Sequence, residues 1–249
     1  MTMVEFDRGA GGGARVGMVV LSTDETLEFE ARQVLAGRDV NMMHTRIESH
    51  PQVTPESLQE MKALMPASAW LLPAALDAVA YGCTSASVLI GPEVVERQIQ
   101  TVQPGVPVTN PITAVIAALT ALGVKRIALV TPYTAAVAAP MRAFLADRGI
   151  QTVKEISFGE GDDRQVARIS QASTLAAMLD AGRNDGVQAV FASCTNLGAF
   201  NIIDQAEAEL GLPVISSNLA LIWHLLQLAG VDASGWGPGK LFRDHGAVG

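Results

Sequence analysis

Short apolar runs alternate with longer stretches of mixed polarity along almost the whole chain. The runs at residues 16–21, 40–47 and 126–131 have the length and composition of buried strands. Further strands are expected at 78–81, 106–108, 153–158, 189–192 and 214–216. Helices are expected after residue 26, from Thr54, and at 112–122, 136–148, 173–181 and 219–228. Strands that alternate with helices imply parallel sheets with covered faces, so the predicted fold class is α/β.

Two of the predicted strands end in nearly the same sequence. Residues 78–85 read Ala-Val-Ala-Tyr-Gly-Cys-Thr-Ser, and residues 189–196 read Ala-Val-Phe-Ala-Ser-Cys-Thr-Asn. A second pair of segments, 105–110 and 211–216, is also similar, and a helix is expected after each. The repeat occurs only twice, which indicates two related lobes and not a solenoid. Because ligands bind at the carboxyl edge of such sheets, Cys83 and Cys194 are expected to face one substrate.

The two cysteines are the only ones in the chain. A lone cysteine is often just a small buried apolar residue. Here each is expected at the start of a helix that carries acidic residues. The partial positive charge at that helix end, with nearby N–H and hydroxyl donors, would favour thiolate over the usual pKa of about 8.5. Two opposed thiols can remove and return a proton, or one can add covalently while the other assists.

Polar residues close to these strand ends are candidates for substrate binding. Such residues often cap helices, but the same donors also hold a carboxylate or an enolate oxygen. For Tyr133, after the strand at 127–130, a hydrogen bond to substrate is favoured over a surface position. Asp24, after the first strand, is equally well read as a helix cap or as a ligand for a positively charged group. The other candidates are Thr84, Ser85, Thr195 and Asn196.

Several other features carry weaker expectations. His224 lies in an apolar helix and is read as a satisfied, partly buried histidine and not as a catalytic base. The run 159–163 is read as a solvated polar loop, and the tail 234–242 as a segment that packs back on the body. Residues 1–15 are read as a flexible leader without function, because the glycine-rich stretch lacks the strand and Lys-Ser/Thr ending of a phosphate loop.

Composition narrows the classes of partner. The chain has 249 residues, 49% of them hydrophobic and 5% aromatic, which is typical of a soluble α/β enzyme. A net charge of −8 without basic clusters excludes a nucleic-acid partner, and no apolar run reaches the roughly 18 residues of a membrane helix. The four histidines lack metal-ligand spacing, so no metal is expected. Without a membrane helix or a basic, apolar leader the protein is expected to be cytoplasmic, where thiols are normally kept reduced, and the apolar helices are compatible with a homo-oligomer.

Four segments together resemble the aspartate/glutamate racemase superfamily, and more closely its maleate isomerase and arylmalonate decarboxylase branch. They are Gly-Cys-Thr-Ser at 82–85, Thr-Pro-Tyr at 131–133, Ser-Cys-Thr-Asn at 193–196 and Pro-Val-Ile-Ser-Ser-Asn at 213–218. The resemblance runs from about Val16 to Phe242. It implies two pseudosymmetric Rossmann-like lobes with parallel sheets, an active site between them, and no cofactor. Lobe 1 would comprise 16–110 and 219–242, and lobe 2 would comprise 111–218.

Carried over by position, the resemblance makes Cys83 and Cys194 the catalytic thiols. It places five residues in a pocket for a carboxylate or enediolate: Thr84, Ser85, Tyr133, Thr195 and Asn196. Arylmalonate decarboxylases have glycine at the first cysteine position, so Cys83 indicates racemisation or isomerisation. Maleate isomerases carry asparagine in the first loop, whereas Asp24 here would repel a second substrate carboxylate and favour an amino or amidinium group. Residues 159–170 and 217–224 resemble ectoine-utilisation members, which implies a stereochemical step on an ectoine-type compound.

The sequence leaves the reaction open. A racemase would use one thiolate to remove the proton alpha to a carboxylate and the other thiol to reprotonate the opposite face. A cis-trans isomerase would add one thiolate to a double bond. A decarboxylase with Cys194 as proton donor would not need Cys83. A non-catalytic small-molecule-binding protein on an enzyme-like fold would have ordinary, unreactive thiols.

Overall fold

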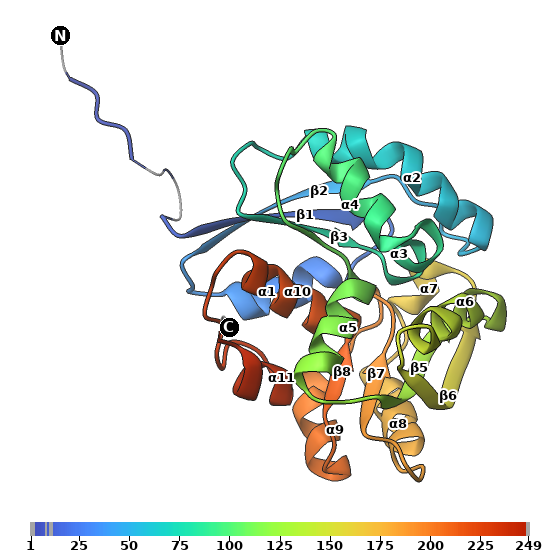
Figure 1. The fold of residues 1–249 in the computed structure, drawn as a ribbon. Coiled ribbons are helices and arrows are strands. Elements are labelled where there is room, and N and C mark those ends of the chain that lie inside the picture. Colours follow the sequence, from blue (N-terminus) through green and yellow to red (C-terminus); the bar gives the residue numbers. More distant parts are fainter. Residues whose placement is uncertain (1–2, 8, 10–11, 248–249) are drawn as a thin grey trace.

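Two four-stranded parallel sheets organise the computed structural model, which describes residues 3–7, 9 and 12–247 (Figure 1). The first sheet has the order β2-β1-β3-β4 and the second the order β6-β5-β7-β8, so both lobes use the same strand order. The strands are β1 (Ala14–Leu21), β2 (Val40–Ile47), β3 (Ala78–Gly82), β4 (Val108–Thr109), β5 (Arg126–Tyr133), β6 (Gln151–Glu160), β7 (Ala189–Ala192) and β8 (Val214–Ser216). The predicted α/β class and the duplication of the lobes are confirmed.

Helices connect the strands and cover the sheets. Their bounds are α1 (Leu27–Leu35), α2 (Pro55–Trp70), α3 (Thr84–Ile90), α4 (Pro92–Gln100), α5 (Pro111–Ala121), α6 (Ala135–Ala146), α7 (Asp163–Val166), α8 (Gln171–Gly182), α9 (Ile203–Leu210), α10 (Ser217–Leu228) and α11 (Gly239–His245), with a 3-10 turn η1 (Phe200–Ile202). Local sequence explains several starts. Thr54 and Ser57 form a reciprocal capping box before α2, and Pro55 occupies its first position, as predicted.

Parallel register brings the two cysteine segments to the carboxyl edges of their sheets. Val20 of β1 pairs with Gly82 of β3, and Val130 of β5 pairs with Ala192 of β7. Cys83 follows Gly82 directly, whereas Ser193 separates Ala192 from Cys194. The predicted placement of one thiol at a strand end in each half is therefore confirmed.

Three local predictions are wrong. The strand expected at 106–108 pairs only at Val108–Thr109, because Pro107 has no N–H to donate to the ladder. No helix starts at Cys194; a turn follows it, and α9 begins only at Ile203. The helix after Cys83 contains no acidic residue, because α3 ends at Gly91 before the acidic residues of α4.

The segment 159–163 is not the solvated loop that its polarity suggested. Gly159 and Glu160 extend β6, and Asp163 opens α7, where the Asp162 side chain accepts a hydrogen bond from the N–H of Arg164. Asp163 is only 3% exposed. A run of glycine and acidic residues usually indicates a surface turn, but here the end of β6 places the Asp163 side chain in the interior.

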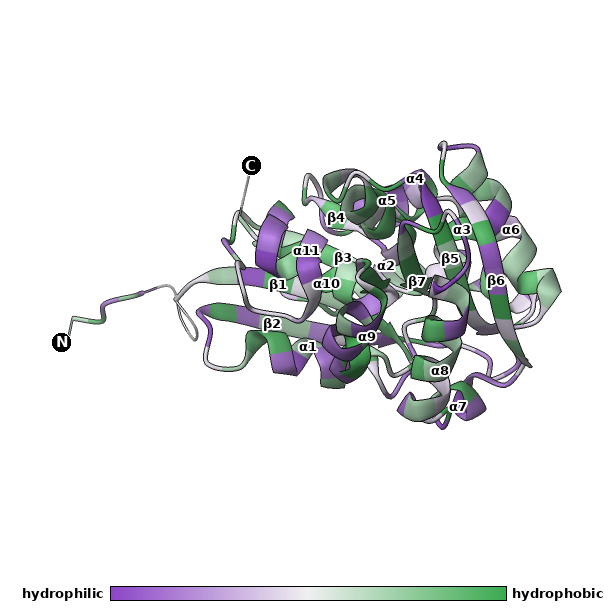
Figure 2. Ribbon diagram, turned by 90° about the horizontal axis from the view of Figure 1, so that it is seen from below, coloured by the Kyte–Doolittle hydropathy of each residue, from purple (hydrophilic) through white to green (hydrophobic). Residues whose placement is uncertain are grey.

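One hydrophobic cluster spans both sheets. It joins Val16 and Met18 of β1 to Ile127 and Leu129 of β5, and α10 packs against β3 and β4 of the first sheet. Figure 2 shows mostly apolar residues in the central strands β5 and β7, whereas α9 and α11 carry many polar ones. The division into lobes 16–110 with 219–242, and 111–218, remains our proposal.

The two ends of the chain behave differently. Leu241 and Phe242 of α11 are buried, which confirms that the tail packs on the body. At the other end, Met3 and Phe6 are more than 85% exposed, and residues 1–2, 8 and 10–11 of the expected leader lie outside the described residues. In the described part of the chain, no helix combines the length and the apolar character needed to cross a membrane.

Candidate active site

The two cysteine loops are hydrogen-bonded to each other across the lobes. The Thr84 hydroxyl donates to Ser217 Oγ at 2.8 Å, and the N–H of Cys194 donates to the same oxygen at 3.1 Å. From the other direction, the Thr195 hydroxyl donates to the carbonyl of Gly82 at 3.3 Å. These contacts join the carboxyl end of β3 to the carboxyl end of β7, so both cysteine segments belong to one site.

Cys83 is the N-cap residue of α3 and is 5% exposed. Its thiol lies beside a cavity of about 10 Å³, which is room for a single water molecule. The cavity wall comes from both lobes: Leu21 and Met61 from the first, Tyr133 and Asp163 from the second. A substrate that reaches Cys83 therefore also reaches the second lobe.

Cys194, Tyr133 and Asp163 form a hydrogen-bond chain. The Tyr133 hydroxyl lies 3.0 Å from Cys194 Sγ and donates to Asp163 Oδ1 at 3.1 Å. Asp163 Oδ2 accepts from the Thr23 hydroxyl at 2.6 Å and from Asn196 Nδ2 at 3.2 Å. When Tyr133 donates to Asp163, its oxygen is free to accept the Cys194 S–H, so a proton can pass from the thiol towards the carboxylate.

Burial dominates the acidity of both thiols. It raises the pKa of Cys83 to about 12 and that of Cys194 well above its ordinary value, and the Asp163 and Asp24 carboxylates raise both further. The N–H of Ala86, at the start of α3, lowers the pKa of Cys83 by less. The expectation of ready thiolates is therefore wrong for the free protein, because the thiols lose their hydration and face negative charge.

The backbone at Cys194 is in a conformation that L-residues rarely adopt, with φ at 140°. Two contacts hold it there. The Ser217 hydroxyl accepts from its N–H, and its sulfur accepts from the N–H of Asn196 at 3.2 Å. Such strain occurs where the surrounding structure fixes a functional geometry.

Asp24 caps α1 with one oxygen and leaves the other unused. Asp24 Oδ1 accepts from the N–H groups of Thr26 and Leu27, each at 2.8 Å. Asp24 Oδ2 is buried without a hydrogen-bond partner. Burial raises the pKa of Asp24 to about 6, while the two N–H donors and the nearby Thr195 hydroxyl lower it by less. The cap predicted for Asp24 is observed, and its role towards substrate remains a proposal.

The structure brings all eight predicted site residues into one buried region, each 6% exposed or less. Most of their polar side-chain groups bond to protein. Asn196, for example, accepts from the N–H of Glu25 and donates to the carbonyl of Asp163 at 2.9 Å, which ties the first loop to α7. Ser85 Oγ and Asp24 Oδ2 are the exceptions, because both are buried and have no partner.

Sequence reasoning missed Asp163, Ser217 and Thr23. Each lies just beyond a strand end on the same edge as the cysteines: Thr23 after β1, Asp163 after β6 and Ser217 after β8. Strand-end position was the signal that could have found them. His224 fits its prediction, since its Nδ1 pairs with the Thr109 hydroxyl at 2.7 Å and burial lowers its pKa. Among the residues the structure describes, no cluster of three or more His, Cys, Asp or Glu is placed to hold a metal ion.

Comparison with known proteins places this site in a family. The sequence profile of the arylmalonate decarboxylase family matches residues 17–242. The chain belongs to this family. It is 27% identical over 248 residues to a maleate isomerase of Nocardia farcinica, which covers 95% of this chain and 98% of the relative. It is 36% identical over 145 residues to the arylmalonate decarboxylase of Bordetella bronchiseptica, with 56% of this chain and 59% of the relative covered.

A solved structure of this family shows covalent cysteine chemistry. It is a variant of the Nocardia farcinica maleate cis-trans isomerase with a covalently bound succinylcysteine intermediate. This chain matches it with a TM-score of 0.82 and 26% identity, over 93% of this chain and 99% of that chain. Relatives that cover more than nine-tenths of this chain thus include isomerases, in agreement with the enzyme class that the family resemblance implied.

Proposed function

We propose that this member of the arylmalonate decarboxylase family is a cofactor-independent isomerase in which Cys83 and Cys194 act on a small carboxylate bound between the lobes. One observation carries the proposal: the Tyr133 hydroxyl is hydrogen-bonded to Cys194 Sγ, and the Tyr133 side chain lines the same small cavity as Cys83. Burial raises the pKa of Tyr133 most, and charge on Cys194, Asp163 and Cys83 would raise it further. Two thiols that share one neighbour, and whose loops are cross-bonded, can reach one small molecule.

Two reaction courses fit this arrangement. In cis-trans isomerisation, a thiolate forms a C–S bond to one alkene carbon and the π electrons move into the carboxylate as an enediolate. Rotation about the new single bond follows, and the C–S bond breaks as the electrons return. In racemisation, one thiolate takes the alpha proton and the other thiol gives its proton to the opposite face. In isomerisation, the Tyr133–Asp163 pair can take the Cys194 proton before the thiolate adds and return it after the C–S bond breaks; in racemisation, the pair can hold that proton while the Cys194 thiolate takes the alpha proton.

Anion binding has candidate donors at the start of α3. The N–H groups of Ser85 and Ala86 lower the pKa of Cys83, so they point towards its sulfur and can also stabilise negative charge on a substrate. Ser85 Oγ, which has no partner, can donate to a carboxylate. We assign Thr84, Tyr133, Thr195 and Asn196 to the same pocket. The relatives suggest maleate, but Asp24 would repel its second carboxylate, so an ectoine-type compound, which the sequence resemblance suggests, fits the charge of the site better.

Two properties outside the site are also proposals. We infer a cytoplasmic location because both cysteines are buried and unpaired. A homo-oligomer remains an expectation from the apolar helices.

Proton NMR in deuterium oxide tests the function. We expect the wild type to exchange the alpha proton of a substrate or to convert a cis signal to trans, and Cys83→Ser and Cys194→Ser each to lower turnover by about a thousandfold or more. Circular dichroism of each variant serves as the control for folding. Full turnover in either variant would remove that thiol from the mechanism.

A decarboxylase is the second candidate, favoured by the 36% identity to arylmalonate decarboxylase. It predicts release of carbon dioxide from a malonate-like acid and undiminished turnover in Cys83→Ser, with Cys194 as proton donor. Thiol reactivity does not separate an enzyme from a binding protein here, because burial raises the pKa of both thiols and so lowers their thiolate fraction in either case. Turnover is the measurement that distinguishes them.

A further inference from the structure

Two buried carboxylates flank the thiols without a cation. Asp24 and Asp163 are 2% and 3% exposed, and each raises the pKa of both Cys83 and Cys194, so both lie within electrostatic reach of both sulfurs. Asp163 accepts hydrogen bonds on both oxygens. Asp24 Oδ2 has none. A buried carboxylate oxygen without a partner is costly unless something binds it.

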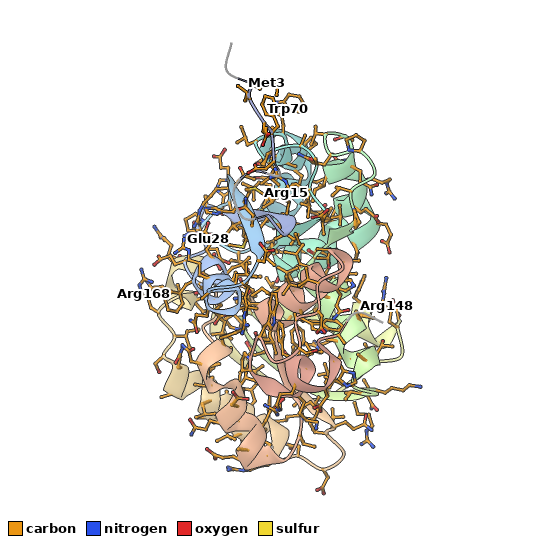
Figure 3. All side chains as sticks on the ribbon, turned by 90° about the vertical axis from the view of Figure 1, so that its left-hand side faces the viewer. Met3, Arg15, Glu28, Trp70, Arg148 and Arg168 are labelled. Atoms are coloured by element: carbon orange, nitrogen blue, oxygen red, sulfur yellow. The ribbon has the colours of Figure 1, made fainter. Side chains whose placement is uncertain are left out.

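The cations near this region are engaged elsewhere. Arg46 pairs with Glu28, Arg164 with Asp162 and Arg168 with Glu25, and only the backbone carbonyl of Asp24 is reached by Arg46. Figure 3 shows Arg168 at the periphery of the molecule. His50 borders the small cavity, but its Nε2 lies 3.3 Å from Glu60 and its side chain is 63% exposed. Among the described residues, no ion pair reaches either Asp24 or Asp163.

We propose that Asp24 and Asp163 make the site selective for a carboxylate substrate that also carries a cationic nitrogen, which binds at Asp24 Oδ2, and that they exclude dicarboxylates. This inference rests on the proposed function, because it places the substrate between the same two thiols. The pair supplies negative charge, and Asp24 supplies the open acceptor. The donors for the substrate's carboxylate lie at the start of α3.

Charge balance explains why this selectivity matters for catalysis. A dianion would enter a buried site that already holds two carboxylates, and like charges at close range in a low-dielectric site oppose binding strongly. A bound ammonium or amidinium group would instead offset those carboxylates. Because the same carboxylates raise the pKa of both thiols, the cation would also make a thiolate easier to form. The substrate then supplies the positive charge that the free site lacks.

Asp24→Asn is a sharp test because it can remove the charge while keeping the helix cap. The asparagine oxygen can still accept from the N–H groups of Thr26 and Leu27, and the amide nitrogen takes the place of Asp24 Oδ2. Glu25→Gln is the matched control. It removes a carboxylate one residue away that pairs with Arg168 and is 50% exposed.

Calorimetric titration with two matched pairs of compounds measures the selectivity directly. The pairs are 2,3-diaminopropionate with aspartate, and 2,4-diaminobutyrate with glutamate, which differ in a terminal ammonium against a terminal carboxylate. We expect the wild type and Glu25→Gln to bind the diamino acids at least about tenfold more tightly, and Asp24→Asn to lose most of that preference. Asp163→Asn should also reduce the preference for the diamino acids over the dicarboxylates.

The outcomes separate this inference from the proposed function. Equal binding of both classes, a preference for dicarboxylates, or no binding of any of the four compounds would overturn the inference. Selective binding that Asp24→Asn abolishes would support it, whether or not turnover is seen. Proton exchange by NMR, with its loss in Cys83→Ser, reports on the isomerase proposal independently.

Discussion

At the scale of single residues, the two candidate catalytic thiols are poorly solvated. The thiols are buried, their pKa values are raised, and Cys194 adopts a strained backbone conformation. Stabilising such a residue requires several fixed contacts. Ser217 and the N–H of Asn196 provide them, which links the geometry of one thiol to the loop that also binds Thr84.

The strain at Cys194 predicts that glycine is more stabilising than alanine at this position. Because φ at Cys194 is 140°, Cys194→Gly should be about 1 kcal/mol more stable than Cys194→Ala. Cys83 provides the control, since its φ of −150° suits any residue and alanine there should be at least as stable as glycine. Urea unfolding of the four variants measures both differences. The same order at both positions would show that Cys194 carries no backbone strain.

At the scale of elements, a buried carboxylate in α1 ties the first lobe to the second. Glu30 is 2% exposed, and its Oε1 accepts from the N–H groups of Ala199 and Phe200, each at 3.0 Å. Its Oε2 accepts from Asn218 Nδ2 at 2.7 Å, at the start of α10. Helix α1 thereby caps the turn before α9 and orients α10, which carries Ser217 into the site.

Glu30 predicts that stability falls as pH rises. Burial raises its pKa from 4.5 to about 7, so the folded state holds this proton more tightly than the unfolded chain. Its stabilising contribution is complete below pH 4.5 and is lost as pH rises through about 7. Each tenfold difference in proton affinity corresponds to about 1.4 kcal/mol. Asp24, with its pKa raised to about 6, acts in the same direction.

Urea unfolding between pH 5 and pH 8 measures this dependence. The free energy of unfolding should decrease with pH in the wild type and decrease less in Glu30→Gln. Glu93→Gln, at an exposed position of α4, should keep the wild-type slope. A wild-type stability that rises over this interval would contradict the assignment.

At the scale of the whole molecule, the two lobes share one apolar core and are joined by hydrogen bonds. The cluster that contains Val16 and Ile127 runs through both sheets, and α10 follows β8 of the second sheet yet packs on β3 of the first. The chain therefore returns from the second sheet to the first, and the apolar core is continuous between them. The small cavity beside Cys83 is walled by residues of both halves, which is the arrangement that our proposed two-thiol site requires.

The shared core predicts one cooperative unfolding transition. Tryptophan fluorescence reports on lobe 1, because Trp70, Trp223 and Trp236 all lie in the segments assigned to it, whereas far-UV circular dichroism reports on the helices of both lobes; the two urea curves should therefore coincide. A Trp223→Phe variant separates the contributions to the fluorescence. Two separated transitions would show that the lobes fold independently.

The sequence by itself determined the fold class, the duplication and the two thiols at strand ends. Apolar periodicity and short repeated motifs are local signals, and the carboxyl edge of a parallel sheet follows from them without further information. The isomerase class came from the family resemblance that four short motifs carry, and the maleate isomerase relatives confirm it.

Only the tertiary structure decided what surrounds those thiols. The sequence predicted Asp163 in a solvated loop, whereas β6 and α7 place its side chain within hydrogen-bond distance of Tyr133 and Asn196. The expected thiolates were wrong because a pKa depends on burial and on charges contributed by distant segments, and local sequence records neither. The sequence could not show that Asp24 Oδ2 lacks a hydrogen-bond partner either, because that depends on which distant segments pack around it.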